Sequence, residues 1–118
     1  MIHLSRLLTL LGTLVVALGA TPVLAETYNA HSPQHEAAVK LFQSNEEPTT
    51  KEAIWTAVGI FKVAVFDDGT RRDGYAQHVC EVLYDYGFRG KKVWVQVIDI
   101  IKLTPKGKWK KLGEAHCQ

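Results

Sequence analysis

The amino-terminal 25 residues constrain the fold most, because their composition separates them from the rest of the chain. Arg6 precedes an almost unbroken apolar run over residues 7–20, and small residues follow at positions 23–25. A basic start, an apolar centre and a small-residue cleavage site together make up a secretory signal peptide. The sequence therefore predicts a signal peptide over residues 1–25 and leaves 93 residues for a folded domain.

An uncleaved membrane anchor is the alternative interpretation of this segment. The apolar run is short for a span of the bilayer, and Thr21 and Pro22 follow it closely. No cysteine lies next to the cleavage point to carry a lipid. We therefore expect an exported protein, periplasmic or secreted, with no stable membrane span after cleavage.

Two cysteines remain after cleavage, Cys80 and Cys117. An even pair in a small exported domain predicts one disulfide, because only one connectivity exists. Closing a loop of this length stabilises a domain by about 3–4 kcal/mol in the chain-entropy model. Two buried free thiols are the alternative, and the absence of a C-x-x-C pair argues against redox catalysis.

Helical spacing predicts two helices. Ser32 before Pro33 predicts the start of a short helix over residues 33–43, followed by a polar linker. A second helix is expected between Asp73, as its cap, and Gly87, as a left-handed terminator. One apolar stripe of this helix includes Cys80 and so turns it toward the core. The stripe consists of Tyr75, Ala76, Val79, Cys80, Leu83 and Tyr86.

Three further segments are predicted to be strands. Residues 53–66 are apolar on both alternating sets and rich in β-branched and aromatic types, which predicts one well-covered strand. Residues 93–103 and 109–117 predict a second and a third strand, joined by a type I turn over residues 104–107. A strand-helix-strand crossover makes the first two strands parallel and the third antiparallel beside the second. The strand order itself stays open.

The turn also predicts which side chains share a face. If Leu103 pairs with Lys108, then Trp94, Ile98 and Ile100 share a face with Trp109, Ala115 and Cys117. We expect this face to be the core side, since it places Cys117 against the helix that bears Cys80. The other face then carries Val95, Val97, Asp99 and Ile101 with His116, Glu114, Leu112 and Lys110, and Asp99 lies within reach of Lys110.

The predicted fold is a small α+β domain over residues 53–118. A three-stranded sheet (strand-helix-strand-strand) is packed by one main helix and stapled by the disulfide. A short helix and a linker occupy residues 26–52.

Charge is distributed unevenly along the mature chain. Residues 26–86 hold five Lys or Arg against ten Asp or Glu, whereas residues 87–118 hold eight against two. Such a split can create an anion-attracting surface. The alternative is that the two halves neutralise each other within the fold.

Two polar clusters are candidates for binding. Residues 67–73 join a strand to a helix, where Arg71 and Arg72 can grip a carboxylate or phosphate. The alternative is a solvated turn whose acids and arginines pair with each other. Basic residues interleaved with an aromatic can bind an anionic polymer, although edge lysines also prevent aggregation. This second cluster, the basic hairpin, contains Lys102, Lys106, Lys108, Trp109, Lys110 and Lys111.

No catalytic, cofactor or metal pattern is recognised. Asp67 and Asp68 fall short of a calcium loop, and the predicted helix cap separates His31 from His35. The leading hypothesis is a non-catalytic module that recognises an anionic envelope component or an acidic protein. Nucleic acid is a poor partner for an exported chain. The expected contact residues are Arg71, Arg72, Lys106, Lys108, Trp109, Lys110 and Lys111.

Two other hypotheses stay open. One is a small hydrolase-like enzyme built on Asp67, Asp68, Arg72 and His78, which requires these side chains to converge on one concave site. The other is a structural subunit of an envelope assembly, with residues 53–66 as an exposed edge strand. The sequence leaves the oligomeric state undetermined.

Overall fold

The computed structural model describes residues 30–101 and 109–118. The predicted signal peptide, the predicted turn over residues 104–107, and Lys102, Lys106 and Lys108 lie outside the described residues. Within the described ranges, no helix is long and apolar enough to cross a membrane.

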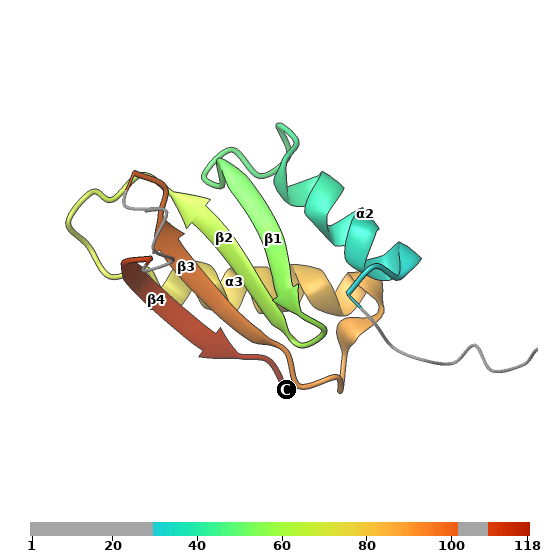
Figure 1. Ribbon diagram of the computed structural model, residues 1–118. Coiled ribbons are helices and arrows are strands. Elements are labelled where there is room, and N and C mark those ends of the chain that lie inside the picture. The colour runs from blue at the N-terminus through green and yellow to red at the C-terminus, as the bar shows by residue number, and fades with distance from the viewer. Residues whose placement is uncertain (1–29, 102–108) are drawn as a thin grey trace, which may run out of the picture.

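Two helices and a four-stranded mixed sheet form a small α+β domain (Figure 1). The strand order is β1-β2-β3-β4, with β2 and β3 parallel and both outer pairs antiparallel. The elements are α2 (Pro33–Phe42), β1 (Glu52–Ala57), β2 (Ile60–Val65), α3 (Asp73–Leu83), the π-helical turn η1 (Tyr84–Phe88), β3 (Trp94–Asp99) and β4 (Lys111–His116).

Both predicted helices are confirmed, with one correction to their ends. Ser32 is the N-cap of α2 and accepts a hydrogen bond from the His35 amide at 3.3 Å. Gly87 ends the continuation of α3 through η1 with a φ of 95°, which suits a glycine terminator. Asp73, however, does not cap α3. Arg72 occupies the N-cap position, and no side chain there caps the helix.

The predicted single strand over residues 53–66 is wrong, because the chain folds there into the β1–β2 hairpin. Val58 and Gly59 connect the two strands. The connection of two residues pairs Ala57 with Ile60, which differ in parity, but the bulge between Trp55 and Ala57 restores the alternation. Odd-numbered residues on either side of the turn, such as Trp55 and Phe61, therefore pair and face the same side. The period-2 pattern therefore runs unbroken through the turn and conceals it. The sheet has four strands instead of three for this reason.

One face of the sheet packs against both helices. Trp55, Phe61 and Val63 of this face are buried beneath α2 and α3. The Phe42 ring of α2 lies 5.5 Å from the Phe61 ring, and the Trp55 indole donates to the His35 carbonyl. Figure 1 shows α3 crossing behind the sheet and α2 lying beside β1. A single hydrophobic core thus fills the helix side of the sheet.

The face predicted as the core side of β3 is the wrong one. Trp94 pairs with His116, and Val97 pairs with Gly113, one residue away from the predicted register. A shift of one residue turns every side chain of a strand to the opposite face. Val95 and Val97 are consequently buried under α3, and Trp94 lies on the outer side.

The Asp99 amide donates to the Lys110 carbonyl at 2.9 Å, but the two side chains form no ion pair. Asp99 is buried and shares the helix-covered face with Val97. Its carboxylate accepts a hydrogen bond from the Ile101 amide at 2.9 Å. Lys110 pairs with Asp67 instead, so the predicted Asp99–Lys110 ion pair is wrong.

The predicted disulfide between Cys80 and Cys117 is confirmed. Both residues are buried, with Cys80 in α3 and Cys117 directly after β4. The bond therefore ties the main helix to the carboxyl-terminal edge of the sheet. Cys117 faces the helices as predicted, but Trp109 and Leu112 of the same predicted strand lie on the faces opposite to those expected.

We expect loss of this bond to lower the free energy of unfolding by about 3–4 kcal/mol, because the unfolded chain regains loop entropy. Guanidinium unfolding of the oxidised protein and of the Cys80→Ala/Cys117→Ala variant measures the difference. Wild-type protein kept reduced is the control and should match the variant. Equal midpoints for oxidised and reduced protein would contradict the prediction.

The outer edge of β4 is occupied by the chain that enters α3. The Arg72 amide donates to the Leu112 carbonyl at 3.0 Å, and the Asp73 carboxylate accepts from the Glu114 amide at 2.9 Å. A Cβ atom on Gly113 would lie 2.3 Å from the Arg72 carbonyl carbon and 2.5 Å from the Asp73 nitrogen. Glycine is required at position 113 because backbone passes where a side chain would begin.

Gly113→Ala should therefore destabilise the fold by about 3 kcal/mol, since backbone must move to accept the methyl group. Gly74→Ala is the matched control, because a Cβ there meets no atom within 4 Å. That control should be neutral or stabilising by about 0.5 kcal/mol. Thermal unfolding compares the two, and similar melting temperatures for both variants would refute the close approach.

Candidate functional site

The acidic turn, residues 66–73, packs against the start of β4. Lys110 Nζ lies 2.9 Å from Asp67 Oδ2, and Arg71 Nε lies 2.7 Å from Asp73 Oδ2. A hydrogen bond from the Gly69 amide, and then one from Lys110, holds the pKa of Asp67 below its usual range. Charges from the two halves of the chain thus neutralise each other here, as the second interpretation of the charge split anticipated.

Arg72 is also engaged within the turn. Its Nη2 lies 3.4 Å from Asp68 Oδ2 and donates to the Phe66 carbonyl at 3.1 Å. Three of the predicted contact residues, Arg71, Arg72 and Lys110, therefore already bind carboxylates of the protein itself. An external anion would have to compete with these carboxylates.

The four residues of the enzyme hypothesis are only partly brought together. Asp68 meets Arg72, but His78 makes no direct contact with Asp67 or Asp68. His78 Nε2 lies 3.1 Å from both carboxylate oxygens of Glu47, and its ring stacks on Tyr75. This histidine serves to attach the linker between α2 and β1 to helix α3.

Tyr75 extends the same attachment. Its hydroxyl lies 2.7 Å from Thr50 Oγ1 and donates to Glu47 Oε1 at 3.1 Å. Thr50 is buried, so the linker does contribute to the interior. Burial, followed by the negative charge of Glu47, raises the pKa of Tyr75 to about 12.

We expect Tyr75 to ionise after tyrosines of ordinary pKa, which titrate near 10. The raised pKa in the folded state means that its contribution to stability is complete below pH 10 and is lost as pH rises toward about 12. Ultraviolet titration of phenolate measures this, with Tyr75→Phe removing the highest-pH phase. A native titration whose last phase survives that substitution would contradict the assignment.

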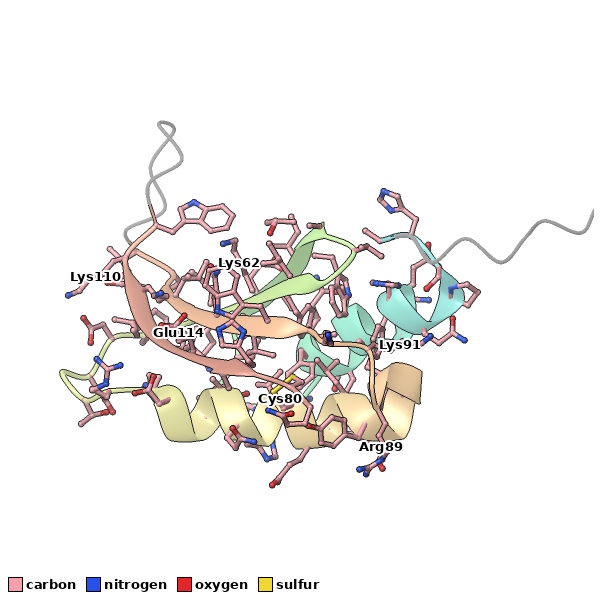
Figure 2. All side chains as sticks on the ribbon, turned by 90° about the horizontal axis from the view of Figure 1, so that it is seen from below. Lys62, Cys80, Arg89, Lys91, Lys110 and Glu114 are labelled. Atoms are coloured by element: carbon pink, nitrogen blue, oxygen red, sulfur yellow. A yellow bond between two sulfur atoms is a disulfide. The ribbon has the colours of Figure 1, made fainter. Side chains whose placement is uncertain are left out.

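The opposite face of the sheet is covered by neither α2 nor α3, and we call it the outer face. Figure 2 shows Lys62 on the outer face and Cys80 on the helix side. Every strand contributes alternate side chains to this surface. Its residues are Glu52, Ile54, Lys62, Ala64, Trp94, Gln96, Ile98, Lys111, Glu114 and His116.

Lys62 is the central cation of the outer face. Its Nζ donates to Gln96 Oε1 and lies 5.1 Å from the centre of the Trp109 ring. It forms no ion pair with any carboxylate of the described residues. Burial lowers the pKa of Lys62, and the positive charge of Lys111 lowers it further. The ammonium group is thus partly desolvated, and no described carboxylate pairs with it.

A second group of side chains is held in place beside Lys62. Lys111 Nζ lies 3.0 Å from Glu114 Oε1 and 5.5 Å from the centre of the Trp94 ring. The Trp94 indole donates to Glu114 Oε1 at 2.9 Å, and its ring stacks on His116 with an interplanar angle of 13°. These contacts fix an aromatic surface on β3 and β4 in one orientation.

A hollow of about 330 Å³ opens beside Lys62. Ala64 is the small residue of its floor, and Ile54, Ile98 and Trp109 form apolar walls. Glu52 also borders the hollow, where its Oε1 accepts hydrogen bonds from Gln43 Nε2 and the Ala53 amide. The hollow therefore combines an apolar interior with a cation at its edge.

Only part of this site was predicted from the sequence. Trp109 and Lys111 were expected contact residues and do lie at the outer face. Trp94 and Trp109 were, however, both expected on the core side of the sheet, and that placement is wrong. Lys62 was missed, although it is the only charged residue between positions 53 and 66. That single charge in an apolar run was the available signal for an exposed position.

The described residues contain no group of three side chains suited to hold a metal ion. The chain matches no protein-family model, and neither a curated protein nor a solved structure matches it significantly. Its function must therefore be argued from the geometry of the site.

Proposed function

We propose that this protein is a non-catalytic binding module that recognises an anionic partner through its outer face. The observation that carries the proposal is Lys62, a partly desolvated cation with no carboxylate partner. The proposed partner is an anionic envelope component or an acidic protein, as expected from the sequence. The proposed contact centre moves from the whole basic hairpin to Lys62, Trp109 and Lys111.

Charge on the outer face favours an anion over a cation. After burial, the positive charge of Lys111 is the second cause that lowers the pKa of Lys62, so the two ammonium groups repel each other. An anion that lies between the two ammonium groups relieves this repulsion. Part of the water around Lys62 is already displaced by Trp109 and Gln96, so its attraction for an anion is less screened than that of a fully hydrated lysine.

The acidic turn, in contrast, is a less favourable site for an external anion than Lys62. Arg71, Arg72 and Lys110 are bound to Asp73, Asp68 and Asp67, so binding an external anion there requires breaking an existing pair. At Lys62 the only bond to be rearranged is the one to the neutral Gln96 amide. A free cation next to a fixed aromatic surface is the more available site.

Polyglutamate provides a defined anionic probe for isothermal titration. We expect wild-type protein to bind it with an affinity that falls as salt is added. Lys62→Gln should weaken binding by about tenfold or more, in the range of a lost partly buried charge contact. Lys111→Gln should weaken it less, because Lys111 remains partly neutralised by Glu114.

Lys40→Gln is the matched control. It removes the same charge from the exposed surface of α2, away from the outer face, and should leave the affinity unchanged. Equal losses for Lys40→Gln and Lys62→Gln would show a general charge effect and contradict the proposed site. Absence of any binding by the wild type would contradict anion recognition itself.

A further inference from the structure

The hollow on the outer face has a shape that charge recognition alone does not require. Its floor crosses three neighbouring strands, because Ala64 of β2 pairs with Glu52 of β1 on one side and Ile98 of β3 on the other. The small Ala64 side chain leaves space that Ile98 and Trp109 enclose. An anion bound only by lysines would leave this apolar space filled with water.

The polar end of the hollow is formed by Lys62. Its Nζ donates to Gln96 Oε1, which is a neutral acceptor. A carboxylate is a stronger acceptor for an ammonium group than a neutral amide oxygen, because the hydrogen bond is assisted by charge on both partners. The lining of the hollow thus places one cationic donor next to apolar walls.

We propose that the hollow binds a small amphiphilic carboxylate, with its charged end at Lys62 and its alkyl chain over Ala64 against Ile98 and Trp109. This inference rests on the proposed anion recognition and names the ligand class for the same site. A volume of about 330 Å³ lies at the lower end for small-molecule pockets. The ligand is therefore a short-chain acid and not a complete phospholipid.

The alkyl chain should contribute through burial. Each methylene group removed from water improves affinity by about fourfold, which corresponds to about 0.8 kcal/mol. Glu52 borders the hollow, so a ligand with a second negative charge at its far end is disfavoured. The preferred ligand thus has one charged end and one apolar end.

Hexanoate, octanoate and octanamide are the probes, measured by isothermal titration and by quenching of Trp109 fluorescence. We expect octanoate to bind about tenfold more tightly than hexanoate, and octanamide to bind weakly because it lacks charge. Lys62→Met keeps an apolar side chain at position 62 and should abolish the preference for octanoate over octanamide. Equal binding of both by the wild type would overturn the role of Lys62.

Ala64→Leu separates this inference from the proposed function. It fills the hollow without changing charge, so octanoate binding should fall at least tenfold while polyglutamate binding is retained. Ala64→Val is the milder variant should leucine disturb the sheet, and thermal unfolding checks both. If the wild type binds polyglutamate but does not bind octanoate, the proposal of an amphiphilic ligand is overturned and the proposal of anion recognition is not. Failure with both probes would overturn both proposals.

Discussion

The one-sided packing of the sheet is the constraint on which the rest of the structure depends. The described residues form two α-helices, and both cover the same face. His35 secures α2 there, since its ring packs against Trp55 and Phe88 and its Nε2 lies 3.0 Å from the Val58 carbonyl oxygen. The disulfide secures α3 at the opposite edge of the sheet, after β4. Because both described helices pack on one side, the side chains of the outer face are held in place by contacts with one another.

Electrostatic pairing then determines which charges stay available. The early, acidic part of the chain and the late, basic part meet at the turn before α3, where Asp67 pairs with Lys110. Lys111 pairs with Glu114 along β4. Lys62 lies on an inner strand whose neighbour across the sheet is the neutral Gln96, and it forms no ion pair with an acid of the described residues. The candidate site is thus built around a cation that these ion pairs leave available.

Features encoded by a few adjacent residues could be predicted from the sequence. Ser32-Pro33 located the start of α2, Gly87 located the end of the main helix, and helical spacing turned Cys80 toward Cys117. Features that depend on pairing between distant segments were not predictable in the same way. The Val58-Gly59 turn and the bulge before Ala57 together keep the odd-even alternation, so the turn leaves no trace in it. The bulge after Val97 changes the β3–β4 register, which moved Trp94 from the expected core to the site.

The two edge strands of the sheet differ in whether their outward backbone groups are already hydrogen-bonded. Along β4, Leu112 and Glu114 already use their outward backbone groups to bind Arg72 and Asp73, and Gly113 lets that segment lie directly against the strand. A further strand cannot add in register there, whereas β1 carries no such cover from the described chain. Of the two described edges, only that of β1 is therefore open to pairing with another strand. Association through these edges alone would close into a pair and would not propagate, because propagation requires two receptive edges on each copy.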